Sequence, residues 1–318
     1  MNRKKIFFSG LAFSVFIFIC GNSSAFSHPS NRNHLYSSFY FPTPKDTTSA
    51  AADTADNDIK YREFIFQNEY GTNSVVKGRI NGKLPYSEPG FTYNALSGFN
   101  CGFTITRLLG KYNIWDEKDL TAGWDFDFTD SWDGSIAYAH QFYNSQTPKL
   151  NSVLDNSIIG ETGYDFNIIY TSITAESDFG SIKSKAKKKN NSLSDFSLIY
   201  AISHLFEIDH LFRKKKKDEL DIEPKISWEG GTQNSYDQYF KKKAENTQGY
   251  TYNPVKSPTA FSTLNYEFSL PITYTIGHFS IVPEWDYYLP QNVISADVSS
   301  KPYGIGILTL SYTFRKPK

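Results

Sequence analysis

The fold is decided by one stretch, TLNYEFSLPITYTIGHFSIVPEWDYYL, which runs from Thr263 to Leu289. From Leu264 to Ile276 every second residue is bulky and apolar, and most residues between them are polar. After the glycine at Gly277 the alternation starts again and continues to the end of the stretch. A period of two is typical of a β-strand, and a glycine between two such runs indicates a tight hairpin. The stretch therefore predicts two adjacent antiparallel strands.

Both runs are longer than an ordinary strand of about five or six residues, and they exceed the roughly 9–11 residues with which a tilted strand crosses a bilayer. Aromatic residues make up 17% of the chain, which suits girdles of aromatic side chains at two membrane–water interfaces. The mean hydropathy of −0.46 excludes a helical membrane protein but not a barrel, whose inner face is polar. A soluble barrel or sandwich would bury the bulky face, but the strand length favours contact of that face with lipid.

The N-terminus has the parts of a secretory signal peptide in residues 1–25. A basic segment ending at Lys5 precedes an apolar segment from Ile6 to Cys20, and Ala25 completes a small-x-small cleavage site. Alternatively, Cys20 is the modified cysteine of a lipoprotein. Residues 26–59 are rich in Ser, Thr, Asn, Pro and Ala without periodicity, which predicts a disordered linker. Residues 60–318 remain as the predicted barrel domain.

Alternating runs follow one another through this domain. Twelve are distinguished, at residues 64–70, 76–80, 93–105, 120–128, 136–142, 150–159, 164–170, 196–206, 220–228, 263–276, 279–289 and 308–314. Joining the first two and omitting 150–159 gives the alternative of ten strands. Three prolines, Pro224, Pro271 and Pro283, fall inside these runs, and each predicts a bulge or a strand end because proline cannot donate to a ladder.

The lengths of the connections favour twelve strands over ten. Single-chain bacterial barrels have an even number of antiparallel strands, with short periplasmic turns and longer outer loops. With twelve strands, the short turns TDSWDG (129–134), GETG (160–163) and 277–278 all fall on the periplasmic side. The lysine-rich segment 183–192 and the segments 230–258 and 290–302 then fall outside.

The final run carries Leu308, Leu310, Tyr312 and Phe314, and four further residues follow it. Together with the signal peptide and the series of strands, this ending resembles bacterial outer-membrane β-barrel proteins, whose last strand finishes in alternating apolar residues with a terminal aromatic. The resemblance implies an all-β, antiparallel transmembrane β-barrel in the outer membrane of a Gram-negative cell envelope. It also implies assembly by the barrel-assembly machinery and contact with outer-membrane lipid and lipopolysaccharide.

If the bulky face meets lipid, the polar residues of each strand line the interior. The candidate pore-lining residues are Glu63, Glu69, Lys77, Arg79, Asp119, Asp125, Asp127, Asp165, Glu267, Glu284 and Asp286. An acidic interior concentrates cations and repels anions, which predicts a small porin-like pore for cations or small polar solutes. The alternative is a non-conducting barrel, in which Lys77 and Arg79 pair with carboxylates to fill a closed interior and the long outer loops serve structure or binding.

Other functions find little support in the sequence. The formal net charge is zero, and the chain has no nucleic-acid module, no glycine-rich phosphate loop and no cysteine–histidine metal spacing. A hydrolase needs a base placed beside a nucleophile, but His140 and His204 lie in the bulky phase, and His210 and His278 lie at strand ends or turns. We therefore expect no enzymatic activity, no cofactor, no metal and no nucleic-acid partner.

Overall fold

The structure is a computed structural model, and the residues it describes are 61–75, 84–111, 113–144, 154–183, 190–209, 218–246, 251–254, 257–294 and 300–317. The signal peptide expected at residues 1–25, the linker expected at 26–59 and the strand expected at 76–80 lie outside the described residues. In the described part of the chain, no helix is long and apolar enough to cross a membrane.

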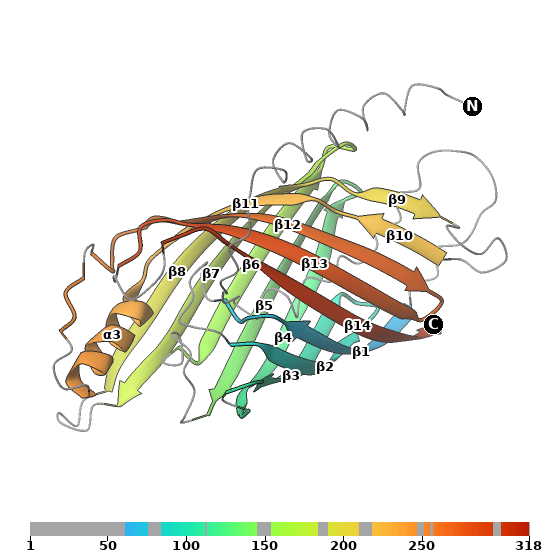
Figure 1. Ribbon diagram of the computed structural model, residues 1–318. Coiled ribbons are helices and arrows are strands. Elements are labelled where there is room, and N and C mark those ends of the chain that lie inside the picture. The colour runs from blue at the N-terminus through green and yellow to red at the C-terminus, as the bar shows by residue number, and fades with distance from the viewer. Residues whose placement is uncertain are drawn as a thin grey trace.

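The chain forms one large antiparallel sheet with a single described helix (Figure 1). The strands are β1 (Tyr61–Gly71), β2 (Tyr86–Asn94), β3 (Phe99–Leu108), β4 (Trp115–Thr129), β5 (Trp132–Tyr143), β6 (Asn156–Asp165), β7 (Tyr170–Lys183), β8 (Asn190–Ser203), β9 (Phe206–Asp209), β10 (Asp218–Ile222), β11 (Lys225–Gly231), β12 (Ser262–Ile276), β13 (Phe279–Pro290) and β14 (Tyr303–Pro317). The helix, α3 (Asn234–Asn246), lies between β11 and β12.

The sheet closes on itself as a barrel of twelve strands. Neighbouring strands pair in chain order, β1 pairs with β14, and β11 pairs with both β8 and β12. The element β9 continues β8, and β10 leads directly into β11, so these four elements make two interrupted strands of the wall. The predicted all-β class and strand number are therefore confirmed, and the alternative of ten strands is wrong.

The two interrupted strands break at neighbouring points of the wall. Residues 204–205 separate β8 from β9, and Glu223 with Pro224 separates β10 from β11. The Pro224 carbonyl accepts from the His204 N–H (3.3 Å), and the Pro271 carbonyl accepts from the Glu223 N–H (3.2 Å). The prediction that Pro224 marks a strand end is thus correct, whereas Pro271 and Pro283 lie within β12 and β13.

All connections fall at one of two ends of the barrel. The turn end carries the connections 95–98, 130–131, 166–169, 210–217 and 277–278, together with the start of β1 and the end of β14, where Tyr61 is opposite Pro317. The loop end carries the connections 72–85, 109–114, 144–155, 184–189, 232–261 and 291–302. Four of the five turn-end connections have two to four residues and every loop-end connection has at least six, so the predicted alternation of short turns and longer loops is present except at 210–217, which has eight (Figure 1).

Four local predictions are wrong. The run 164–170 is not one strand, because β6 ends at Asp165, β7 begins at Tyr170 and the connection 166–169 lies between them. The run 93–105 is two strands, because Ala95 and Gly98 form a turn in which Gly98 has a positive φ of 88° and its N–H donates to the Ala95 carbonyl (3.1 Å). The segment GETG (160–163) is the middle of β6 and pairs in register with β5 and β7. The segment 230–258, read as a loop, contains α3.

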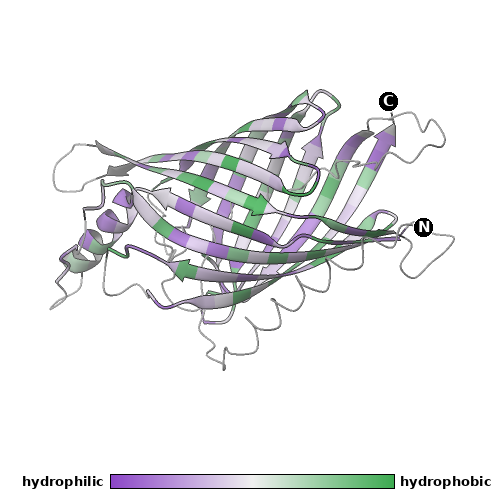
Figure 2. Ribbon diagram, turned by 90° about the horizontal axis from the view of Figure 1, so that it is seen from above, coloured by the Kyte–Doolittle hydropathy of each residue, from purple (hydrophilic) through white to green (hydrophobic). Residues whose placement is uncertain are grey.

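Side chains on each strand alternate between a bulky outer face and a polar inner face. Large apolar side chains such as Phe66, Ile136 and Trp285 remain 43–54% exposed, although polar neighbours in the opposite phase are buried. Figure 2 shows hydrophobic and hydrophilic segments alternating along the strands. An apolar outer face of this size would be unfavourable in water, whereas a barrel that spans a bilayer needs such a face to contact lipid. The wall therefore has a lipid-facing and an interior surface.

Candidate functional site: the acidic interior

The described candidate residues all lie in the inward phase of their strands. Their positions follow from the register, since each shares its face with buried polar residues and alternates with exposed aromatic ones. They are Glu63 and Glu69 on β1, Asp119, Asp125 and Asp127 on β4, Asp165 on β6, Glu267 on β12, and Glu284 and Asp286 on β13. The two predicted basic members, Lys77 and Arg79, lie outside the described residues.

At the loop end the inward carboxylates are buried. We call this set the loop-end ring, and its members, each at most 7% exposed, are Glu69, Glu88, Glu117, Asp119, Glu176, Asp178, Asp195, Glu229 and Asp286. Hydroxyl groups of neighbouring strands donate to several of them: Thr106 to Glu88 (2.6 Å), Ser157 to Asp178 (2.5 Å) and Tyr86 to Glu69 (2.5 Å). Buried carboxylates require such partners, because an unsolvated charge without them is costly.

Apolar residues fill part of the interior at the same end. Val75, from the connection between β1 and β2, packs in a buried cluster with the inward-facing Tyr288, Tyr303, Ile305 and Ile307 of β13 and β14. A second buried cluster joins Leu84, Tyr86 and Leu108, with Ile114 packed against it. The loop end of the interior is therefore packed along β1–β3 and β13–β14.

At the turn end the inward carboxylates are closer to water. We call this set the turn-end cluster, and it consists of Asp125, Asp127, Asp133, Glu161 and Asp165 on β4, β5 and β6. Both acids of β4 in this cluster are exposed, although Asn100 donates to Asp125 (2.8 Å). Thr174 donates to Glu161 (2.9 Å), and the Tyr170 hydroxyl donates to Asp133 (2.8 Å).

Carboxylates stand directly opposite one another at four places in the wall where both side chains are described. The register pairs Glu69 with Glu88, Asp178 with Asp195, Asp127 with Asp133, and Glu207 on β9 with Asp221 on β10. Like charges at directly opposed positions destabilise a sheet. Such pairs occur at both ends of the barrel although they cost stability. Packing alone therefore does not account for the acidic interior.

Inward-facing bases are few by comparison. In the strands whose side chains are described, they are Lys225 on β11 and Arg315 on β14. The Arg315 guanidinium donates to Glu63 across the β1–β14 pair (2.9 Å) at the turn-end rim. The described interior therefore carries a large excess of negative charge.

Several interior acids were missed because strand boundaries were misplaced. Glu88 lies in β2, outside the predicted run 93–105, and Glu161 was placed in a turn but lies in β6. Glu176 and Asp178 lie beyond the predicted end of their run, because β7 extends to Lys183. The alternation Thr174, Glu176, Asp178 would have revealed them, since it continues the polar phase of the same strand.

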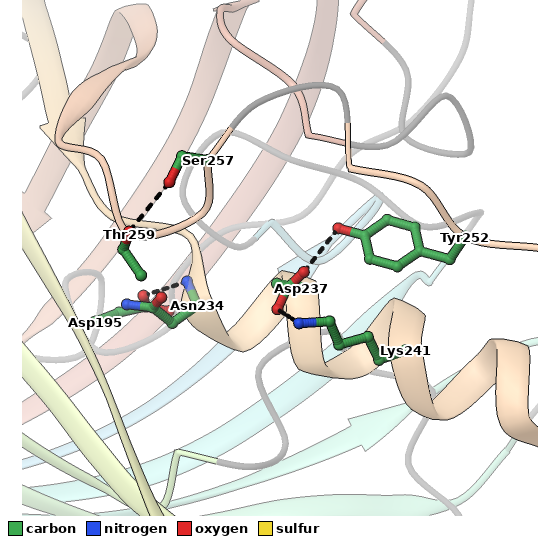
Figure 3. Close-up of polar contacts among 7 residues, drawn as sticks. All are labelled: Asp195, Asn234, Asp237, Lys241, Tyr252, Ser257 and Thr259. Atoms are coloured by element: carbon green, nitrogen blue, oxygen red, sulfur yellow. Dashed lines mark hydrogen bonds and ion pairs between the residues drawn. The ribbon is translucent and has the colours of Figure 1, made fainter.

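One acid of the loop-end ring holds the start of α3 in place. Asp195 on β8 accepts from the backbone N–H groups of Asn234 (2.6 Å) and Ser235 (2.9 Å), the first residues of α3. It also accepts from the hydroxyls of Thr232 (2.9 Å) and Ser235 (2.5 Å). A carboxylate at this position satisfies donors that a helix N-terminus leaves unpaired and interacts favourably with the helix dipole. Figure 3 shows Asp195 beside Asn234 at the start of the helix.

Further contacts make α3 and its neighbouring loops a folded unit at the loop end. Tyr236 and Phe240 are buried with Ile294 from the segment after β13, and Tyr252 packs against them. The carboxylate of Asp237 accepts from Lys241 (2.5 Å) and from the Tyr252 hydroxyl (3.3 Å), as Figure 3 shows. The apolar spacing of Tyr236, Tyr239 and Phe240 was the sequence signal for this helix.

The described histidines lie away from the interior acids. His140 faces outward and shares a hydrogen bond with Asn156 (2.9 Å), and His204 contacts the Ile168 carbonyl. His278 lies in the β12–β13 turn beside Tyr312. In the part of the chain that the structure describes, no group of three or more Asp, Glu, His or Cys side chains is placed to hold a metal ion.

The geometry defines the class of protein. A closed antiparallel barrel of even strand number, with an apolar outer face, a polar interior, short turns at one end and longer loops at the other, is the architecture of outer-membrane β-barrel proteins. The predicted class is therefore confirmed, and the location in the outer membrane stays a prediction that follows from that class.

Comparisons with known proteins were also made. No family model matches the sequence, and no curated protein matches it. Among solved structures, the chain is similar to the NanC porin, with 10% identity and a TM-score of 0.45 over 78% of this chain and 98% of that one. It is also similar to LpxR from Salmonella typhimurium (8% identity, TM-score 0.44, 79% and 100% of the two chains) and to the KdgM porin (8%, 0.42, 79% and 99%). These scores are low, so the class assignment rests on the barrel geometry itself.

Proposed function

We propose that this barrel is a small outer-membrane pore for cations or small polar solutes. The observation that supports the proposal is the charge of the inward face, where carboxylates occur on most described strands and the described bases are Lys225 and Arg315. A confined path lined by carboxylates raises the local concentration of cations and repels anions. No catalytic step, cofactor or nucleic-acid partner forms part of this proposal.

The candidate residues have different roles in this proposal. Asp125 and Asp127 face water at the turn end and set the electrostatic potential at that mouth. Glu267 and Glu284 are partly buried on adjacent strands, with Glu284 accepting from Ser269 (2.8 Å) and Glu267 accepting from Tyr288 (3.2 Å). Glu63 forms an ion pair with Arg315 and contributes little net charge. Because the buried apolar clusters pack at the loop end, we expect the path to be narrowest there.

Ion conductance tests the proposal directly. Purified protein inserted into a planar bilayer should give discrete current steps, and its reversal potential in a potassium chloride gradient should show a preference for cations. Heat-dependent gel mobility is the control for folding, since a folded outer-membrane barrel runs differently from the boiled chain. Discrete steps with an anion preference would contradict the acidic path as the conducting route.

The second candidate function is a non-conducting barrel that acts through its outer loops. Two observations favour it: the loop-end ring is buried, and α3 with its neighbouring loops is a folded unit that could serve as a binding surface. The same bilayer experiment separates the two candidates. Protein that is folded and inserted by gel mobility, but carries no current at any voltage, supports the second.

We propose the usual orientation for the class, with the turn end in the periplasm and the loop end outside. Assembly by the barrel-assembly machinery and contact with lipopolysaccharide belong to the same proposal. In a Cys101→Ser background, a cysteine introduced at Thr259 should react with an impermeant maleimide on intact cells. A cysteine at His278, in the β12–β13 turn, should react only after the outer membrane is opened; the reverse pattern would invert the orientation.

A further inference from the structure

Two basic residues interrupt the apolar outer face near the loop end. Arg107 on β3 and Lys118 on β4 both lie in the outward phase, alternating with the inward Thr106 and Glu117. Among outward-facing strand side chains that the structure describes at this end, Lys and Arg occur at these two positions. Among these described side chains, the basic charge at this level lies in one sector of the perimeter, on β3 and β4.

The register brings these two residues together. Lys118 is opposite Ile105 on β3, and a bulge then places Arg107 opposite Trp115 on β4. On the other side of Lys118 lies the outward-facing Phe142 of β5, which is 49% exposed. The two basic groups are therefore diagonal neighbours on one surface, within reach of a single bound group.

The Arg107 side chain is held in a fixed position. Its guanidinium lies 5.4 Å from the centre of the Trp115 ring and donates from Nη2 to Asn113 Oδ1 (2.8 Å). A guanidinium has five N–H donors, so donors beyond the one used remain for a ligand. Trp115 is itself 51% exposed and is the first residue of β4 at the loop end, a position that suits an aromatic girdle at a membrane interface. We therefore expect Arg107 to lie near the boundary between lipid tails and headgroups.

We propose that Arg107 and Lys118 form a binding site for a phosphorylated glycolipid of the outer leaflet, with Trp115 and Phe142 contacting its acyl chains. The charges are complementary, because Arg and Lys bind phosphate through charge-assisted hydrogen bonds. The location fits, because both residues face the bilayer at the end that carries the longer loops, which the proposed orientation places at the outer leaflet. This site is separate from the interior, so it does not depend on whether the barrel conducts.

The chain offers a matched control pair at the opposite rim. Arg62 on β1 and Lys316 on β14 are directly opposite each other, exposed and in the outward phase at the turn end. They have the same charge and are also neighbours on adjacent strands, directly opposite instead of diagonal, but they face the other leaflet. If any pair of outward-facing bases sufficed, both sites would bind the lipid equally.

Native mass spectrometry of the full barrel in non-ionic detergent tests the site, with bis-phosphorylated lipid A and its dephosphorylated form as probes. The wild-type protein should bind the phosphorylated lipid more tightly. Arg107→Gln with Lys118→Gln should weaken that binding by about 25-fold, since each basic residue at an anionic lipid surface contributes a factor of about five. Arg62→Gln with Lys316→Gln should retain wild-type affinity.

Heat-dependent gel mobility checks that each variant is folded. In the wild-type protein, added inorganic phosphate should compete with the lipid, which provides a readout that needs no variant. Equal affinity for the phosphorylated and dephosphorylated lipids would overturn the proposal. An equal loss in the two double variants, or no loss in Arg107→Gln with Lys118→Gln, would overturn it as well.

Discussion

The two ends of the barrel interior carry the same kind of charge in different surroundings. At the loop end, carboxylates such as Glu88 and Asp195 are 1% exposed and accept hydrogen bonds from neighbouring strands and from α3. At the turn end, Asp125 and Asp127 are exposed to water. Acidic residues in one phase of one wall can therefore have different physical roles.

The difference follows from solvation. A buried carboxylate loses its hydration and depends on fixed donors, so its removal or the removal of its donor costs stability. An exposed carboxylate keeps its hydration and contributes mainly through its field, which acts over a distance set by the salt concentration. We therefore expect loop-end substitutions to change folding and turn-end substitutions to change ion preference.

The largest expected effect is at Asp195. Its replacement by alanine leaves the N–H groups of Asn234 and Ser235 and two hydroxyls without this acceptor. We expect the α3 unit to lose about 3 kcal/mol of local stability, measured as faster hydrogen exchange and proteolysis of residues 234–246. Asp195→Asn, which keeps an acceptor oxygen, should lose less. Unchanged exchange in Asp195→Ala would show that other contacts suffice to hold the helix.

A single hydroxyl at the loop end should have the next largest effect. Thr106→Val removes the donor that lies 2.6 Å from the buried Glu88 carboxylate. We expect a loss of about 2 kcal/mol in the free energy of unfolding, measured by urea titration in lipid vesicles. The matched control is Thr171→Val, an outward-facing position near the turn end, where added apolar surface should be neutral. Equal losses at both sites would remove the contrast between the two ends.

Neutralising the turn end should change selectivity without changing stability. Asp125→Asn with Asp127→Asn keeps side-chain size and removes two charges from the mouth. Conductance should persist, while the cation-to-anion permeability ratio should fall a few-fold in bilayer recordings. The unfolding midpoint should stay close to that of the wild type. An unchanged ratio in a conducting variant would place these acids outside the ion path.

The smallest expected effect is the salt dependence of this change in ion selectivity. The Debye length is about 30 Å at 0.01 M salt and about 10 Å at 0.1 M. The difference in selectivity between the wild type and Asp125→Asn with Asp127→Asn should therefore be larger at low salt. Reversal potentials at equal gradients but different mean concentrations provide the measurement. A difference that is constant across concentrations would point to direct coordination of the ion instead of a long-range field.

The strand number was predicted correctly although some of its parts were not. The run 93–105 hides a turn at Gly98, because the residues around it keep the alternation of the strands on either side. The glycines at 160 and 163 suggested a turn, but here they lie inside β6, where the Tyr170 side chain occupies the space that a side chain at Gly163 would need. The run 93–105 contributes two strands instead of one, and the run predicted at 76–80 lies outside the described residues, so the described wall still has twelve strands.

The sequence by itself determined the alternation of outward and inward faces, and with it the barrel class, because the two faces of a strand follow from a period of two that needs no knowledge of neighbours. It also placed the nine described candidate acids in the inward phase. Only the tertiary structure decided which of them are buried, since burial depends on residues distant in sequence, such as Thr106 for Glu88 and Val75 packed against Ile305. Asp195 shows this most clearly, because its partner is a helix that begins 39 residues further along the chain.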